Sequence, residues 1–462
     1  MSKKNFTILI IILVSLTVLM FGIILLFPQS KPAQIIKSVV PSVFPVGNMP
    51  STNTNTPPAN VSGLGGLVPF GTDNLKPTIE VNKLKLQKIS SFPVAGFGVY
   101  NKEIFKEVAP IIPPVATAET ATTTATGLKP TDKKSVIAKP TPPATVFITA
   151  VRYVDKKTGN IYQNLADNIN ERQFTSTIIA KVHDAFFGNN SGTVAMRYLK
   201  DDNLTIESFL GNLPKEVLGG DTTADTDVKG VFLPENITDL SISPDKAKLF
   251  YIFNLNKNAI GVSSGILGDK KSQIFSSPFT EWLTQWPNEK MITLTTKPST
   301  NVPGYMYSID PSKKDFKKVL GSINGLTTNT SPSGRLVLYS SSKNNSINLY
   351  LYNTDTGRSD LLGVKTLPEK CVWTKASDEI YCAVPGSLDR ASYPDDWYQG
   401  IISFGDQIWK IDATNESATT IADPVVISGE EVDGIKLALD DSENFLFFVN
   451  KKDSYLWQLN LK

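Results

Sequence analysis

The sequence predicts an all-β fold, a seven-bladed β-propeller with N-to-C ring closure, preceded by one transmembrane helix and a flexible linker. Three observations predict it: a long apolar run near the N-terminus, a proline-rich region after it, and short alternating strands that recur along the rest of the chain. The 462 residues suffice for one large all-β domain with appendages.

The apolar run covers residues 6–27, FTILIIILVSLTVLMFGIILLF, and contains no charge. A helix of this length reaches about 33 Å, enough to cross a hydrocarbon core of about 30 Å. The alternative, a cleaved signal peptide, has a shorter apolar core and a small-residue cleavage site, which is missing after Phe27. We therefore expect a single-pass cell-membrane protein, with residues 1–5 in the cytoplasm and the C-terminal domain extracytoplasmic. Lysines flank both ends of the run, so this orientation follows the common use of N-terminal anchors.

Two segments have the composition of linkers. Residues 28–80 are rich in Pro, Ser, Thr and Asn and carry few charges, so they cannot bury enough apolar surface to offset the entropy of ordering. Residues 108–145 have the same character and interrupt the strand pattern within the propeller, predicted at 84–462. We expect a solvated, disordered insertion at 108–145, with a partner-binding arm as the alternative.

A pentamer recurs along the chain: an aliphatic residue, an aromatic residue, any residue, an aliphatic residue or Thr, then Asp or Asn. Its four copies lie at 306–310, 351–355, 408–412 and 456–460, so the aromatic positions are 45, 57 and 48 residues apart. This period is typical of propeller blades. The acids that end three copies, Asp310, Asp355 and Asp412, are expected to form turns through side-chain to backbone hydrogen bonds.

A second element, a tight turn followed by an alternating strand, lies upstream of each pentamer, as in SPDKAKLFYIF at 243–253 and SPSGRLVLYSS at 331–341. With two degenerate copies at 148–164 and 188–199, the count is seven blades. The last blade lacks one strand, and the segment 84–94 has spare strand character. We expect this N-terminal strand to complete the last blade and close the ring.

These repeats, S-P-D/S-x-x-x-L-x-Y followed by L-Y-x-x-D-x-x-T/S, resemble the WD40-like PD40 repeat of TolB-type bacterial β-propellers. The resemblance covers residues 84–462, is clearest at 239–363, and is specific for the fold rather than for a function. The N-anchored layout also resembles propeller proteins of candidate-phylum bacteria. The chain departs from TolB itself because it keeps an N-terminal apolar helix and has no room for an α/β domain before the propeller.

The composition excludes several classes of function. Lys and Arg total 46 against 44 for Asp and Glu, which argues against a nucleic-acid binder. One His and two Cys argue against a His-based or four-thiolate metal site. We expect no cofactor and no metal, and the oligomeric state is left open.

The two cysteines lie in CVWTKASDEIYC at 371–382. A hairpin turn that pairs Thr374 with Glu379 places Cys371 directly opposite Cys382. We expect a disulfide between them, as suits an extracytoplasmic domain; two free buried thiols are the alternative.

The stretch Gly261–Gly265 matches the G-x-S-x-G pattern of serine hydrolases, but the context of that motif is missing. The only histidine, His183, precedes Ser263, and no region after the propeller could form an α/β domain. We expect a Gly/Ser loop here and a structural His183.

The segment 392–400, SYPDDWYQG, concentrates carboxylates and aromatic residues in one loop. Aromatic side chains dominate binding interfaces, so Asp395, Asp396, Trp397 and Tyr398 are the candidate binding residues. A structural loop and a Ca²⁺ site are the alternatives; two adjacent Asp residues are weak support for the metal.

The leading hypothesis is a membrane-anchored extracytoplasmic β-propeller that binds a protein, peptide or glycan of the cell envelope, or serves as a scaffold for it. Its basis is the anchor, the linker and the repeats, without a recognisable catalytic set. The alternative is an envelope hydrolase whose acidic residues converge from different blades in the central funnel, and the expectation leans away from an enzyme.

Overall fold

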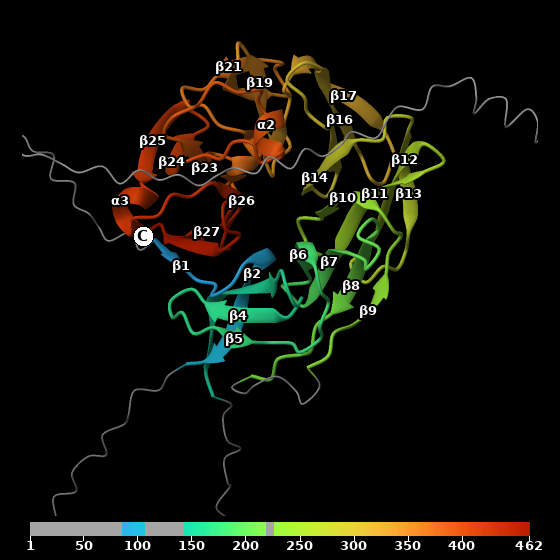
Figure 1. Ribbon diagram of the computed structural model, residues 1–462, viewed down its shortest axis with the longest axis vertical. Coiled ribbons are helices and arrows are strands. Elements are labelled where there is room, and N and C mark those ends of the chain that lie inside the picture. The colour runs from blue at the N-terminus through green and yellow to red at the C-terminus, as the bar shows by residue number, and fades with distance from the viewer. Residues whose placement is uncertain (1–85, 107–142, 219–225) are drawn as a thin grey trace, which may run out of the picture. The chain divides into compact units, whose positions relative to one another are not determined.

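The computed structural model describes residues 86–106, 143–218 and 226–462. They form seven four-stranded sheets, arranged as blades around a central axis (Figure 1). The predicted all-β, seven-bladed propeller is thereby confirmed. The predicted membrane helix at 6–27, the linker at 28–80 and most of the insertion at 108–145 lie outside the described residues. Within the described ranges, no helix is both long and apolar enough to span a membrane.

Each blade is an antiparallel sheet, and six of the seven are built from consecutive strands. Blade 1 contains β2 (Val94–Phe105), β3 (Thr145–Asp155), β4 (Ile161–Leu165) and β5 (Arg172–Gln173). Blade 2 contains β6 (Val182–Gly188), β7 (Thr193–Leu199), β8 (Ile206–Asn212) and β9 (Lys229–Phe232). Blade 3 contains β10 (Ile237–Ile242), β11 (Lys248–Leu255), β12 (Asn258–Gly265) and β13 (Ser272–Ser277). Blade 4 contains β14 (Trp282–Asn288), β15 (Met291–Thr296), β16 (Pro303–Ile309) and β17 (Phe316–Asn324).

Blades 5 to 7 complete the ring and carry the short helices. Blade 5 contains β18 (Thr328–Thr330), β19 (Leu336–Lys343), β20 (Ser346–Asn353) and β21 (Ser359–Leu361). Blade 6 contains β22 (Cys371–Trp373), β23 (Glu379–Pro385), β24 (Asp406–Asp412) and β25 (Ser417–Ala422). Blade 7 contains β26 (Gly434–Leu439), β27 (Phe445–Asn450), β28 (Leu456–Asn460) and β1 (Leu86–Lys88). A 3-10 turn η1 (Pro368–Lys370) and the helices α2 (Asp395–Tyr398) and α3 (Pro424–Ser428) lie in the connections.

The position of a strand within its blade decides its composition. Blades pack face to face, so the second strand is covered on both faces: all six residues of β27 are buried. The outermost strand lies at the rim, and all four residues of β9 are exposed. The recurring pentamers fall on the third strands β16, β20, β24 and β28. Their period therefore marks equivalent strands, as expected.

Two of the three acids that end a pentamer form turns through their side chains, as expected. The carboxylate of Asp310 accepts hydrogen bonds from the backbone of Ser312 and Lys313, and Asp412 has the same role in its own turn. The expectation for Asp355 is wrong, because Asn353 accepts the turn hydrogen bonds there and Asp355 pairs with Arg335. An amide oxygen two residues earlier fits the turn equally well.

Ring closure follows the expected route. The strand β1 pairs antiparallel with β28, with Leu86 opposite Leu459 and Lys88 opposite Trp457. The backbone N–H of Ile89 continues the ladder to the carbonyl of Leu456 at 2.8 Å. Figure 1 shows β1 beside the C-terminus. The N-terminal strand therefore covers the outer edge of the last blade, which would otherwise be open.

Both cysteines lie in blade 6. Cys371 on β22 is the cross-strand partner of Cys382 on β23, and the structure joins them by a disulfide. The backbone N–H of Thr374 donates to the carbonyl of Glu379 at 2.9 Å, which sets this register. The disulfide lies in an apolar cluster that also contains Leu349 and Ile411.

Candidate functional site

The first strand of each blade lies nearest the central axis of the ring (Figure 1), and we call the space at this axis, which these strands line, the channel. Two adjoining cavities occupy it. The channel cavity, of about 600 Å³, is lined from β6, β10, β14, β18 and β26 and from α2 and η1. A second cavity, of about 520 Å³, is lined from β2, β6, β10, β14 and β26. The two share four lining residues: Phe186, Thr284, Gln285 and Lys436.

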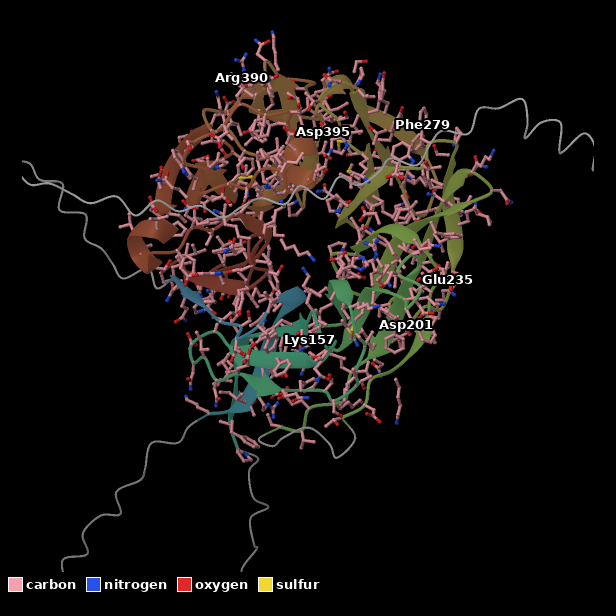
Figure 2. All side chains as sticks on the ribbon, in the orientation of Figure 1. Lys157, Asp201, Glu235, Phe279, Arg390 and Asp395 are labelled. Carbon is pink, nitrogen blue, oxygen red and sulfur yellow. A yellow bond between two sulfur atoms is a disulfide. The ribbon has the colours of Figure 1, made fainter. Side chains whose placement is uncertain are left out.

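The predicted binding residues form the short helix α2, between β23 and β24, rather than an irregular loop. The structure divides them into two pairs. Trp397 and Tyr398 line the channel cavity. Asp395, labelled in Figure 2, accepts hydrogen bonds from the backbone N–H and the hydroxyl of Thr300 at 2.6 and 2.7 Å. Asp396 accepts from the backbone N–H of Ser392 at 2.8 Å. The two acids thus hold the segment in place, and the two aromatic residues face the cavity.

A buried ion-pair network fixes the indole of Trp397, which is only 3% exposed. Its Nε1–H donates to Asp433 Oδ2 at 2.9 Å. The ammonium of Lys370, fully buried, pairs with both Asp433 and Asp406 and donates to the carbonyl of Gly434 at 3.0 Å. Such a network is costly to disrupt, because removing one partner leaves an uncompensated buried charge.

The two acids of this network have opposite pKa shifts. Burial raises the pKa of Asp406 to about 6, although the ammonium of Lys370 opposes the rise. Burial acts on Asp433 too, but the charge of Lys370 and hydrogen bonds from Phe404 and Trp397 hold its pKa below the ordinary value. Asp433 is therefore the acid that stays ionised and anchors the indole.

Two further carboxylates line the channel cavity, from different blades. Asp239 on β10 accepts a hydrogen bond from the backbone N–H of Thr284 on β14, and burial raises its pKa to about 6. Glu369 on η1 accepts from the hydroxyl of Tyr398, and burial raises its pKa as well. The pKa of Tyr398 is raised by burial and then by the charges of both Glu369 and Asp239. Glu369 thus contacts the Tyr398 hydroxyl, and Asp239 lines the same cavity.

The two lysines of the channel cavity already have partners. Lys436 pairs with Asp184 and donates to the carbonyl of Ala95 at 2.7 Å. Lys451 donates to the carbonyl of Trp397 at 2.8 Å, with its ammonium 4.7 Å from the centre of the indole ring. Burial lowers the pKa of Lys451. Both ammonium groups therefore stabilise the cavity wall.

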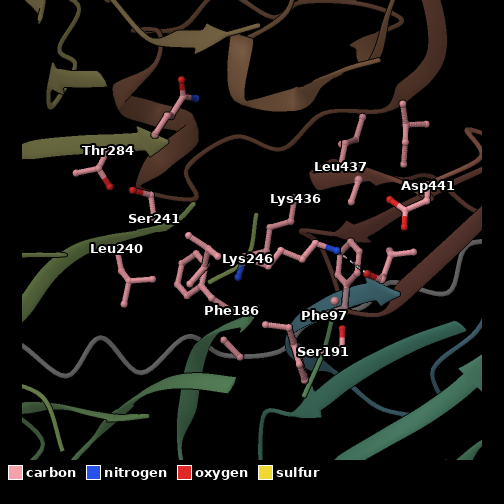
Figure 3. Close-up of a pocket in the computed structure, with 18 residues that line it drawn as sticks. Phe97, Phe186, Ser191, Leu240, Ser241, Lys246, Thr284, Lys436, Leu437 and Asp441 are labelled. Carbon is pink, nitrogen blue, oxygen red and sulfur yellow. Dashed lines mark hydrogen bonds between the residues drawn. The ribbon is translucent and has the colours of Figure 1, made fainter. Parts of the chain in front are cut away.

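The second cavity is shown in Figure 3. Its wall carries aromatic and aliphatic side chains, among them Phe97, Phe186 and Leu437, together with Lys246 and Asp441. Lys246 donates to the carbonyl of Val99 at 3.0 Å, and burial lowers its pKa. Asp441 is 2.8 Å from the ammonium of Lys375. The charged groups of this cavity thus serve the contacts between blades.

Other motifs of the sequence do not form a site. Gly261–Gly265 lies on β12, in the third strand of blade 3, so the expectation of a loop is wrong; a strand interior also lacks the strand-to-helix turn of a nucleophile elbow. His183 is exposed on β6, beside the salt bridge of Asp184 and Arg197. Within the described ranges, no three His, Cys, Asp or Glu side chains are grouped as metal ligands.

Two residues of this cavity, Asp239 and Glu369, are not predicted from the sequence. They are 130 positions apart and converge only because blades 3 and 6 face the same channel. Each is a single acid in a polar turn or strand, without a local pattern. The density of aromatic residues at 392–400 was the one sequence signal that led to this cavity.

No protein-family model matches the sequence, and no curated protein sequence matches it significantly. Solved structures with similar folds include an oligogalacturonate lyase from Vibrio parahaemolyticus, with a TM-score of 0.45 and 9% identity over 68% of this chain and 86% of the lyase. TolB from Acinetobacter baumannii has a TM-score of 0.38 and 12% identity, over 68% of this chain and 77% of TolB. The β-propeller domain of the trilobed protease from Pyrococcus furiosus has a TM-score of 0.44 and 11% identity, over 68% of this chain and 90% of that domain. At these identities the similarity concerns the fold alone, and function has to be argued from the channel.

Proposed function

We propose that this protein is a binding module whose ligand site is the channel cavity beside α2. The observation that carries the proposal is the convergence of Trp397 and Tyr398 with Asp239 and Glu369 on one cavity of about 600 Å³. This volume and this mixture of aromatic walls with a few polar groups are typical of ligand sites. Tyr398 is 41% exposed, so a ligand can reach it.

The rigidity of the wall supports a binding role. Asp433 and Lys370 hold the indole of Trp397 from behind, and the acids of α2 tie the helix to its neighbours. A preorganised wall lowers the entropy that a ligand loses on binding. The rigid wall is therefore suited to recognising one particular chemical group.

The proposal includes a location. We propose that residues 6–27 anchor the chain in the cell membrane, that residues 1–5 are cytoplasmic, and that the propeller faces the cell envelope, where a protein, peptide or glycan is the partner. The uncharged run at 6–27 and the Cys371–Cys382 disulfide support this placement, because disulfides persist in oxidising compartments. Protease added to spheroplasts should then digest the propeller, and full protection would reverse the orientation.

A cavity-filling variant tests the binding site. Leu283 is half-buried and lines the cavity, so Leu283→Trp should block it while the fold survives. Leu361→Trp, at a 60% exposed position on β21, is the matched control. Crosslinking pull-downs of the full chain should lose their specific partners with Leu283→Trp and keep them with Leu361→Trp. Equal recovery from both variants would exclude the cavity.

A second candidate function is hydrolysis of an envelope polymer. The observation that favours it is the pair Asp239 and Glu369: burial raises both pKa values, that of Asp239 to about 6, and a raised pKa suits a general acid. Incubation of the purified protein with envelope glycans and peptides, followed by mass spectrometry, separates the two functions. Cleavage that disappears in both Asp239→Asn and Glu369→Gln would establish the enzyme.

A further inference from the structure

We propose that the channel cavity recognises a basic side chain, an ammonium or guanidinium group on an apolar stem, presented by a peptide ligand. This inference rests on the proposed binding function and names the chemistry of its ligand. The basic group would lie at the wall made by Asp239, Glu369 and Tyr398.

The two carboxylates of this wall have no cation of their own. Within the described ranges, neither Asp239 nor Glu369 has a lysine or arginine nitrogen within ion-pair distance, in contrast to the fully paired Asp433. Their donors are neutral: the backbone N–H groups of Thr284 and Leu240 for Asp239, and the hydroxyl groups of Tyr398 and Thr327 for Glu369. A ligand cation would supply the missing partner, and a charge-assisted hydrogen bond is stronger than a neutral one.

A third group on the same wall lacks a partner. Thr284 is only 9% exposed, and its hydroxyl makes no hydrogen bond with any described residue. Thr284 lines both cavities, and Figure 3 draws its side chain on the wall of the second one. The hydroxyl oxygen is itself buried, so it is an unsatisfied polar group within the wall between the two cavities.

The rest of the wall suits an apolar stem. Phe186, Leu283, Trp397, Tyr398 and Ile435 contribute aromatic and aliphatic surface. Lys and Arg side chains combine such a stem with a charged head, and aromatic faces near the head add cation–π attraction.

The donor groups of the wall argue against a sugar. The amide nitrogen of Asn329 donates to the carbonyls of Pro368 and Cys371, and that of Gln285 donates to Thr328. A sugar would bring several hydroxyl groups into a site whose donors are already engaged. A sugar hydroxyl can donate to the same carboxylates, but its oxygen would find these amide donors engaged, whereas a basic side chain needs only acceptors.

The lysines of the cavity do not occupy the acidic wall. Lys436 is held by Asp184, and Lys451 by the carbonyl and ring of Trp397. A ligand cation in contact with Asp239 and Glu369 would be closer to these acids than either ammonium group is. Because Coulomb energy falls with distance, a ligand cation in direct contact with these acids interacts with them more strongly than either lysine does.

Isothermal titration calorimetry on the purified full chain in detergent tests the inference with acetyl-Ala-Lys-Ala-amide as the probe. The matched probe acetyl-Ala-norleucine-Ala-amide keeps the stem and removes the charge, and glucosamine represents a cationic sugar. Asp239→Asn and Glu369→Gln remove the proposed partners, while Glu281→Gln changes an exposed acid on the connection before β14. Melting temperatures of all variants establish that they fold.

We expect the lysine peptide to bind at least about tenfold more tightly than the norleucine peptide, and each cavity variant to weaken it by a similar factor. Glu281→Gln should bind as the wild type does. Equal binding of the two peptides, unchanged binding by both cavity variants, preference for glucosamine, or no binding at about 5 mM peptide would each overturn the inference. If the lysine peptide fails these tests but the Leu283→Trp variant still loses its native partners, the channel cavity remains a binding site. Only the proposal that its ligand is a basic side chain is then refuted.

Discussion

The indole N–H of Trp397 donates to the carboxylate of Asp433 at 2.9 Å, and this hydrogen bond joins the wall of the channel to a buried charge network. Asp433 precedes the first strand of blade 7, whereas Trp397 belongs to a connection of blade 6. Lys370 pairs with Asp433 and Asp406 and completes the junction. One network therefore positions the aromatic wall and holds two blades together.

Lys370→Met should destabilise the propeller by about 3–5 kcal/mol at neutral pH, because it leaves two buried carboxylates without their cation. Without that cation, the pKa of Asp406 in the folded state rises further above its unfolded value, and the pKa of Asp433 loses the charge that holds it below its ordinary value. Acids with raised folded pKa values favour folding at low pH and lose that contribution as pH rises. Urea unfolding should thus show a larger loss at about pH 8 than at about pH 5.

The matched control is Lys297→Met. Lys297 also pairs with an acid, Glu281, at 3.1 Å, but both side chains are more than half exposed. An exposed pair contributes little, so the free energy of unfolding should change by less than about 1 kcal/mol. Similar losses in the two lysine variants would contradict the role of the buried network.

Asp239→Asn should stabilise the fold above about pH 6, because the raised pKa of Asp239 means that its ionisation opposes folding. The gain is present where the carboxylate is charged and vanishes as pH falls toward its ordinary pKa. A rise to about 6 corresponds to at most about 3 kcal/mol. Thermal unfolding from about pH 4 to pH 8 measures it, with the exposed Asp201→Asn as a control.

This variant separates a binding role from a structural one. Replacing an acid that supports the fold lowers the stability of the protein. Replacing an acid that serves ligand binding raises the stability of the protein and lowers its affinity for the ligand. If Asp239→Asn lowers the melting temperature at pH 8, Asp239 supports the fold instead of a ligand.

The Cys371–Cys382 disulfide should be found by non-reducing mass spectrometry of the mature protein. It closes a short loop, and the chain-entropy estimate for such a loop is about 3 kcal/mol. Reductant should lower the melting temperature of the wild type and leave Cys371→Ala/Cys382→Ala unchanged. The chain has only these two cysteines, so free thiols would exclude the disulfide directly.

Ring closure predicts a sharp dependence on the N-terminal strand. A chain starting at Thr78 retains β1 and should melt as the full chain does. A chain starting at Ser91 loses β1 and the buried side chain of Ile89, so the outer edge of β28 becomes exposed. It should melt at a clearly lower temperature or aggregate; equal melting of both chains would show that closure by β1 is dispensable.

The sequence allows the fold to be predicted further than the site. Each blade repeats the same pattern of buried middle strands and polar turns, so pentamers such as Met306–Asp310 identify equivalent strands over the whole ring. The pairing of β1 with β28 also follows from the count of strands, because the last blade lacks one strand, whereas the register that places Leu86 opposite Leu459 comes from the structure.

The channel is different, because its residues converge from separate blades. Trp397 and Tyr398 were predicted from local aromatic density, but Asp395 and Asp396 in the same segment stabilise the backbone instead. Asp239 and Glu369 have no local signal, since they belong to different blades and meet only at the cavity that both line.

Photo-crosslinking from the channel tests the central claim most directly. p-Azidophenylalanine at position 398, in the full chain expressed in cells, replaces a side chain that faces the cavity. The same residue at position 279 is the control, because Phe279 is 68% exposed at the outer rim of the ring (Figure 2). The account predicts a distinct crosslinked species from position 398 that is missing from position 279 and is competed by the lysine peptide. Crosslinks of the same kind and amount from both positions, or none from position 398, would contradict a ligand site in the channel.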